Sequence, residues 1–206
     1  MADVAAVVLA AGRALRFAGG AAGRTKLTEM LGGKPLVRWA VEAALASGAT
    51  PVVVVTGHAR DAVIAALTGL DIREARNAHY ADGLASSLIA GIAALPPTSA
   101  SALVLLGDMP LVDASLCRRL IEAFAADRDI DAVAPVVHGR RGNPVMLSRA
   151  LFAEVEGLRG DEGARKLLMR PSMRVVDIEA AGEGAGFDVD TPEALAALRA
   201  SAAPIV

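Results

Sequence analysis

The most constraining feature of this sequence is its first apolar run, Val4 to Leu9, which ends directly in the small residues Ala10, Ala11 and Gly12. The run predicts a buried strand that carries a small-residue turn to the rim of a sheet. Small side chains at such a turn let backbone N–H groups approach a ligand closely. The stretch therefore predicts a ligand site at the carboxyl end of a parallel strand, with a tight turn that binds nothing as the alternative.

A glycine-rich span with positive charge follows this turn, and Arg16 and Lys26 flank it. A loop that closes over a triphosphate needs mobility and positive charge together, so the span favours a nucleoside triphosphate site. An exposed loop whose arginine and lysine serve solubility is the alternative.

The composition argues against several classes of protein. The 206 residues favour one α/β domain, and a hydrophobic share of 54% is enough for one large core. An aromatic share of 3% and a net charge of −2 argue against a nucleic-acid partner. The three histidines lack ligand spacing to one another, which argues against a zinc site.

The sequence also gives an expectation for the compartment. The single cysteine, Cys117, excludes an intramolecular disulfide and favours an intracellular setting. No uncharged apolar run reaches the length of a membrane span, and the N-terminus lacks the basic-then-apolar layout of a signal peptide. We therefore expect a cytoplasmic protein without a membrane partner.

Strand-like and helix-like segments alternate along the chain, which predicts a mostly parallel sheet with helices on both faces. We expect strands over residues 4–9, 51–56, 72–75, 102–106, 132–137, 144–147 and 175–178. We expect longer helices over residues 36–47, 60–67, 84–95 and 114–126, a final helix from 191–193 onward, and two short helices near 151 and before 169.

Two aspartates follow strand-like segments. Asp108 comes after an apolar run that ends at Gly107, and Asp190 precedes Thr191 and Pro192. Carboxylates at the ends of parallel strands point into the ligand crevice, and two that converge there suit Mg²⁺. The alternatives are a turn aspartate at position 108 and a helix-capping aspartate at position 190.

Two further polar segments are candidates for ligand contacts. Gly83, Ser86 and Ser87 place hydroxyls and N–H groups at a helix N-terminus, which favours an anion or a ribose edge, with plain capping as the alternative. The loop 139–143 either contacts a substrate phosphate or forms a solvated hairpin. A dinucleotide-type glycine motif does not follow the first strand, which weakens a redox-cofactor interpretation.

Several motifs together resemble a known family. Residues 9–12 with Arg16 and Lys26, followed by residues 31–36, resemble the opening of nucleotidyltransferases that act on sugar phosphates, methylerythritol phosphate and molybdopterin. Residues 80–88, 107–110, 141–144, 160–165 and 188–193 then follow in order and look like the molybdenum-cofactor cytidylyltransferase branch. Guanylyltransferase relatives have a sequence like Ala-Gly-Gly at the position where this chain has Ala10, Ala11 and Gly12. This difference favours cytosine over guanine as the base.

The resemblance implies a Rossmann-like three-layer α/β sandwich of the nucleotide-diphospho-sugar transferase type, with one nucleotidyltransferase domain over residues 1–206. It implies transfer of CMP from CTP to the molybdopterin cofactor with release of pyrophosphate, Mg²⁺ as cofactor and a molybdoenzyme client as a further partner. The alternatives are GTP as donor, a sugar phosphate or methylerythritol phosphate as acceptor, and a non-catalytic nucleotide- or cofactor-binding module; some relatives in this broad group are oxidoreductases.

The resemblance also implies roles for individual residues. The catalytic residues would be Arg16, Lys26 and Asp108, and the metal ligands Asp108 and Asp190. The nucleotide would be held by Leu9, Ala10, Ala11, Gly12, Lys26, Gly83, Ser86, Ser87, Gly107 and Asp108. The acceptor would be held by Arg141, Gly142, Asn143, Pro144 and Asp161. The span from Arg16 to Lys26 departs from the family pattern because it is longer and richer in glycine and alanine.

Overall fold

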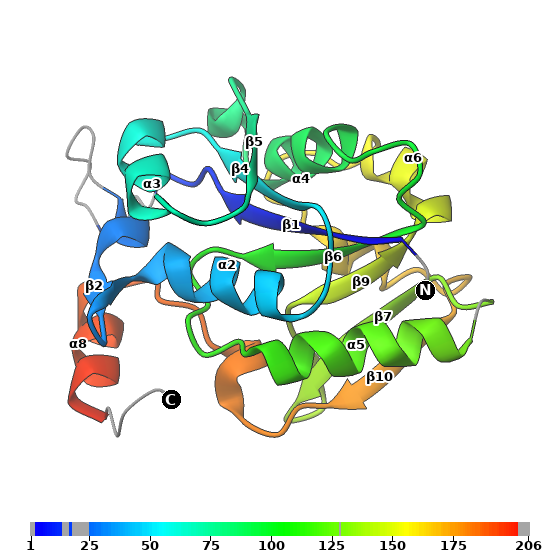
Figure 1. Cartoon of the computed structure of the whole chain (residues 1–206). Helices are drawn as coiled ribbons and strands as arrows, with labels where there is room; N and C mark the ends of the chain where they lie inside the picture. The colour runs from blue at the N-terminus through cyan, green and yellow to red at the C-terminus, as the bar shows by residue number, and fades with distance from the viewer. Residues whose placement is uncertain (1–2, 14–16, 18–24, 128, 202–206) are drawn as a thin grey trace.

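A central mixed sheet organises the part of the chain that the structure, a computed structural model, describes: residues 3–13, 17, 25–127 and 129–201 (Figure 1). In sheet order its strands are β10 (Val175–Glu179), β7 (Ala132–Val137), β9 (Val145–Ser148), β6 (Ser101–Leu106), β1 (Val4–Ala10), β4 (Val52–Thr56) and β5 (Arg73–Arg76), with β8 (Arg140–Arg141) paired to β7.

Strand direction in this sheet is mostly parallel. β1 runs parallel to β4 and to β6, β4 runs parallel to β5, and β10 runs parallel to β7. β9 is antiparallel to both of its neighbours, and β8 is antiparallel to β7. The sheet confirms the predicted α/β fold class and places the carboxyl ends of β1, β4 and β6 at one edge.

Helices cover both faces of the sheet. They are α2 (Leu36–Ala46), α3 (Arg60–Ala66), α4 (Leu84–Ala93), α5 (Ala114–Ala126), α6 (Phe152–Val155), α7 (Ala164–Leu167) and α8 (Pro192–Ser201), with 3₁₀ turns η1 (Lys26–Thr28), η2 (Tyr80–Asp82), η3 (Arg149–Leu151) and η4 (Glu183–Gly186). The expected final helix is therefore present, and the expected helix before residue 169 is only one turn long.

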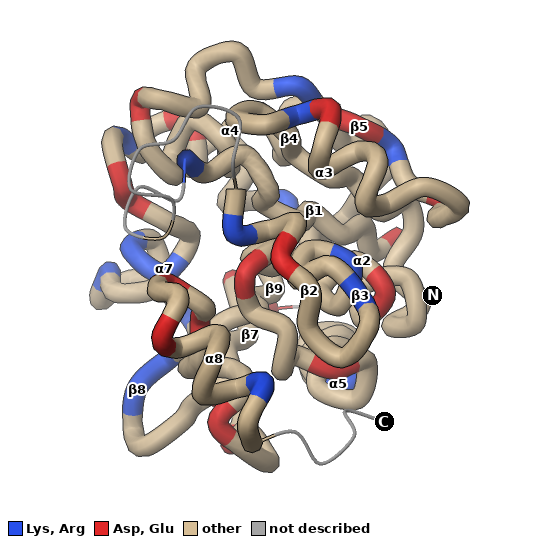
Figure 2. The backbone as a smooth tube through the Cα atoms, turned by 90° about the vertical axis from the view of Figure 1, so that its left-hand side faces the viewer, with Lys and Arg blue, Asp and Glu red and all other residues tan. Residues whose placement is uncertain are grey.

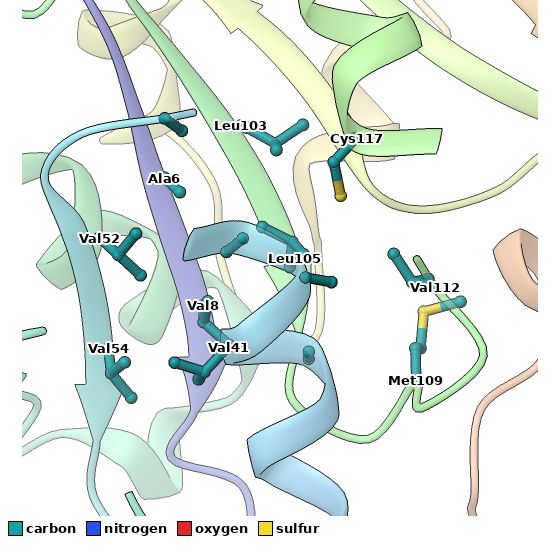
Figure 3. Close-up of a cluster of buried hydrophobic side chains, with 14 of the residues drawn as sticks. Ala6, Val8, Val41, Val52, Val54, Leu103, Leu105, Met109, Val112 and Cys117 are labelled. Carbon is teal, nitrogen blue, oxygen red and sulfur yellow. The ribbon is translucent and has the colours of Figure 1, made fainter. Parts of the chain in front are cut away.

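The alternating directions of the side chains along β1 explain why helices pack on both faces of the sheet. All seven residues of β1 are buried, and successive side chains of a strand point to opposite faces. Ala6 and Val8 pack with residues of α2, α3 and α5, such as Val41 and Cys117, as Figure 3 shows for part of this cluster. Ala5, Val7 and Leu9 pack instead with α4, α6 and α7. Burial raises the pKa of the Cys117 thiol to about 12, which fits a packing role for this residue.

The loop that follows β7 forms a tight hairpin with β8. Val136 and Val137 pair with Arg141 and Arg140, and His138 and Gly139 make the turn with φ values of 49° and 72°. Positive φ at both central residues matches the right-handed twist of the strands. Of the two alternatives for residues 139–143, a hairpin is therefore present, and contact with a substrate phosphate stays a prediction. None of the helices in the described part of the chain has the length and apolar character needed to span a bilayer. The extent of the domain over residues 1–206 stays a prediction.

Candidate functional site

A cavity of about 500 Å³ opens at the edge of the sheet where β1 and β6 end. The predicted site residues that line it are Leu9, Ala11, Gly12, Lys26, Gly83, Ser87, Asp108, Asp161 and Asp190. Six further residues line it: Arg13 from the loop after β1, Leu84 from the predicted segment 83–87, and Leu27, Tyr80, Ala81 and Leu106, which were not predicted. The structure therefore brings most of the predicted nucleotide residues into one cavity, together with Asp161.

Close packing of two turns builds the floor of this cavity. β1 and β6 are paired to their ends, with Leu9 opposite Leu106. The N–H of Gly107 then donates to the carbonyl oxygen of Leu9 at 3.0 Å. A Cβ on Gly107 would lie 3.1 Å from that same oxygen, so a small residue suits this position. The next residue, Asp108, is carried over the end of β1.

Three aspartates converge beside this floor. Carboxylate oxygens of Asp108, Asp188 and Asp190 lie within 4.8 Å of one another. The N–H of Val189 donates to the backbone oxygen of Asp108 at 3.0 Å, which joins the two segments. Val189 itself is fully buried against Leu31 and neighbouring residues, and the carboxylates of the aspartates on either side of it belong to the cluster.

The donor set of this cluster fits a divalent cation. Hard carboxylate oxygens are the ligands that Mg²⁺ and Mn²⁺ prefer. At the start of α8, Thr191 Oγ1 accepts the N–H of Ala194 at 3.2 Å, so Thr191 supplies a side-chain cap to this helix. Asp188 was missed in the sequence, although its spacing of two residues from Asp190 places both carboxylates on one side of an extended segment.

A buried lysine lies between two of these carboxylates. Lys26 Nζ is 2.7 Å from Asp108 Oδ2 and 2.7 Å from Asp190 Oδ1, and its side chain is only 10% exposed. Burial by itself would lower the pKa of Lys26, but the charges of Asp108 and Asp190 and the hydrogen bonds to them raise the pKa above its ordinary value. The ammonium group of Lys26 is therefore charged.

The surroundings of Asp188, the third aspartate of the cluster, disfavour its charged form. Burial, followed by repulsion from Asp190 and Asp108, raises the pKa of Asp188 above its ordinary value, and Lys26 offsets only part of this effect. In Figure 2, acidic and basic positions lie close together beside β2 (Met30–Leu31). The cluster thus holds more negative charge than Lys26 neutralises, which favours an additional cation.

Gly83 joins two walls of the cavity. Its φ is 101°, and a Cβ there would lie 2.3 Å from the carbonyl carbon and oxygen of Gly160. The N–H of Ala85 donates to that oxygen at 2.9 Å. This close approach brings Asp161 to the cavity that the start of α4 also lines.

Gly83→Ala is expected to destabilise the protein by about 3 kcal/mol, because it combines a backbone conformation suited to glycine with a steric clash. Denaturant unfolding of purified protein measures this change. Gly69→Ala is the matched control: Gly69 has a φ of 84° with no atom near its Cβ position, so we expect a loss of only about 1 kcal/mol. Equal losses in the two variants would contradict the role of the contact with Gly160.

The remaining predicted residues lie elsewhere. Arg141 donates to Asp177 at 2.7 Å and to the backbone oxygen of Leu168 at 2.6 Å, and the N–H of Asn143 donates to the backbone oxygen of Ala185. Arg141, Gly142, Asn143 and Pro144 are not among the residues that line the cavity, nor are Ala10, Ser86 and Gly107. Arg16 lies outside the described residues. The assigned roles of these residues stay predictions.

Comparison with known proteins places the chain among relatives. The model of the family described as MobA-like NTP transferase domain matches residues 6–175. Nicotine blue oxidoreductase of Paenarthrobacter nicotinovorans is 32% identical over 195 residues, which cover 92% of this chain and 93% of that protein. The bifunctional protein GlmU of Pelobacter propionicus is 34% identical over 155 residues, which cover 75% of this chain but only 32% of GlmU. The chain thus spans only part of the length of the GlmU relatives that it matches.

A solved structure has a similar fold over nearly the whole chain. Rv0371c from Mycobacterium tuberculosis is 26% identical, with a TM-score of 0.83 over 97% of this chain and 99% of the other. A manganese complex of Rv0371c is also similar, with 25% identity and a TM-score of 0.77 over 97% of this chain and 99% of that one.

Proposed function

Because the chain belongs to the family of MobA-like NTP transferase domains, we propose that it transfers CMP from CTP to the molybdopterin cofactor and releases pyrophosphate. The observation that carries this proposal is the placement of Lys26 between Asp108 and Asp190 at the wall of the cavity. A buried cation next to a surplus of carboxylates is suited to a triphosphate that binds together with a divalent metal.

In this reaction a phosphate oxygen of the acceptor attacks the α-phosphorus of CTP, and the bond to the pyrophosphate oxygen breaks. Lys26 and, as the resemblance implies, Arg16 would offset the negative charge on the phosphates. The backbone of residues 9–12 would hold the base and ribose. Acceptor binding is assigned to Asp161 and residues 141–144. The reaction needs no protein nucleophile.

The metal would be held by Asp108 and Asp190, with Asp188 beside them. When bound, Mg²⁺ supplies positive charge to the phosphate oxygens. Lys26 Nζ lies within 2.7 Å of both proposed metal-binding carboxylates. The finer assignment of Mg²⁺ over other divalent ions belongs to the proposal.

Pyrophosphate release tests the reaction directly. Purified protein is incubated with Mg²⁺ and molybdopterin cofactor, and CTP, GTP and ATP are compared, with Asp108→Ala as the control. We expect release that is selective for CTP and absent in the variant. CTP binding without release from any nucleotide would contradict the enzymatic assignment for this acceptor and favour another acceptor or a binding module that serves a molybdoenzyme client.

A second candidate function comes from one relative. Nicotine blue oxidoreductase matches this chain over nearly the full length of both proteins, which favours a redox reaction as the alternative. A redox enzyme would respond to a nicotinamide or flavin cofactor. Oxidation of reduced nicotinamide by the purified protein with nicotine blue as the electron acceptor, in the absence of pyrophosphate release, would favour this alternative over nucleotidyl transfer.

A further inference from the structure

A buried asparagine next to the cavity has no role in the function proposed above. Asn77 directly follows β5 and is 4% exposed. Its backbone N–H donates to the carbonyl oxygen of Thr56 at 2.8 Å, and its side-chain Oδ1 accepts the backbone N–H of His79 at 2.8 Å. A backbone N–H can only donate, so this contact identifies which end of the amide is oxygen and which is nitrogen.

The amide nitrogen then contacts two serines of α4. Nδ2 donates to Ser86 Oγ at 2.9 Å and to Ser87 Oγ at 3.1 Å. Both serine oxygens are therefore acceptors toward Asn77, and each hydroxyl keeps its own proton for another partner. Ser86 Oγ lies 2.8 Å from the backbone oxygens of His79 and Gly83, where its proton is used.

Ser87 differs from Ser86 in whether its hydroxyl proton has an acceptor within the protein. Ser87 is 5% exposed and lines the cavity. Among the described residues, none accepts a hydrogen bond from its hydroxyl. A buried hydroxyl favours a complete set of hydrogen bonds, so this proton is available to an acceptor atom of a molecule in the cavity.

The surroundings of Ser87 indicate which part of a nucleotide would accept the proton of its hydroxyl. Its helix neighbours Ala85 and Leu88 belong to the apolar cluster that also contains Leu9 and Ala11 of the cavity wall. Lys26, Asp108 and Asp190 form a charged cluster on this cavity, and Arg13 and Asp161 line it as well. An apolar wall suits a planar base, and a charged wall suits phosphates.

We propose that Asn77 is a positioning residue that presents Ser87 as a hydrogen-bond donor to a carbonyl oxygen or ring nitrogen of the nucleobase. This inference rests on the proposed function, because it requires that a nucleotide occupies the cavity. Asn77 acts through Ser87 and touches no ligand itself in this arrangement.

The proposal makes a distinction between two replacements of Asn77. In Asn77→Asp, one carboxylate oxygen keeps the contact with the N–H of His79, and the other accepts the proton of Ser87, which turns the hydroxyl away from the base. In Asn77→Ala, three hydrogen bonds are lost, but the Ser87 proton stays free to reach the base. We therefore expect the aspartate variant to bind the base more weakly than the alanine variant, whereas a purely structural role predicts the reverse order.

Titration calorimetry with two ligands, CTP and inorganic tripolyphosphate, tests this proposal in the presence of Mg²⁺. We expect Ser87→Ala to raise the dissociation constant for CTP about fivefold to tenfold, since one hydrogen bond is lost. Asn77→Asp should raise it at least as much. The dissociation constant for tripolyphosphate should stay unchanged in Ser87→Ala, because this ligand has no base. In Asn77→Asp it measures the general repulsion of an anion by the new carboxylate, and the loss of CTP affinity should exceed it. Ser101→Ala, a buried serine at the opposite end of β6, should change neither constant.

Three results would overturn the proposal. Ser87→Ala or Asn77→Asp could bind CTP as the wild type does, Asn77→Ala could bind it more weakly than Asn77→Asp, or both ligands could be weakened equally. If the wild-type protein binds neither CTP nor another nucleoside triphosphate, the proposed function fails and this inference falls with it. Binding of CTP by the wild type with an unaffected Ser87→Ala variant overturns the inference alone.

Discussion

Replacing Asp108 with asparagine is expected to lower the rate of pyrophosphate release about 10³-fold, near the upper end of the effect of one electrostatic group on a transition state. Asparagine keeps the shape of the side chain but removes the charge that contacts Lys26 at 2.7 Å and that would bind the metal. The backbone contact from Asp108 to Val189 does not depend on the side chain, so the turn should persist. Initial rates at saturating CTP and Mg²⁺ measure the effect.

A matched carboxylate outside the cavity controls for the general loss of a negative charge. Asp61 is 94% exposed and pairs with Arg60 on α3, so Asp61→Asn should retain the wild-type rate. A circular dichroism spectrum and melting curve show whether Asp108→Asn is folded. A folded Asp108→Asn variant that keeps a rate within tenfold of the wild type would contradict the assignment of Asp108 to the metal and phosphate site.

The fold could be predicted in large part because its signals are local. The apolar run at residues 4–9 and the valines of β4 fill both faces of a central strand, and this pattern is visible without knowledge of the rest of the chain. The direction of β9, by contrast, cannot be predicted from its local sequence. Its antiparallel place between β6 and β7 depends on how the chain returns from the hairpin at β8, which composition does not encode.

The site residues could be predicted only where a polar side chain directly follows a clearly apolar strand segment. Asp108 follows β6, so its place at the sheet edge could be expected from the sequence. The contact between Lys26 and Asp190 joins residues 164 positions apart and depends on the packing of Val189 against Leu31. Asn77 shows the limit most clearly. It sits in a loop with ordinary turn residues, and only the hydrogen bonds of the folded chain distinguish it from a surface asparagine.

Replacing Lys26 with methionine is expected to have two opposite effects. Pyrophosphate release should fall about 10²-fold to 10³-fold, because a cation beside the triphosphate is lost. The affinity of the nucleotide-free protein for Mn²⁺ should rise about tenfold or more, since the ammonium group no longer competes for the two carboxylates or repels the ion. Electron paramagnetic resonance titration with Mn²⁺ measures the affinity without any need for turnover.

Lys34→Met provides the matched control, because Lys34 pairs with Glu42 rather than with the aspartates of the site. Its Mn²⁺ affinity should equal that of the wild type. Melting curves add a second measurement: Lys26→Met leaves three carboxylates close together without their internal cation, so Mn²⁺ should raise its melting temperature more than that of the wild type. If Lys26→Met binds Mn²⁺ no more tightly than the wild type, Lys26 and the metal do not share Asp108 and Asp190. Tighter binding with lost activity would instead mean that the lysine keeps metal affinity low until a nucleotide draws its ammonium group away.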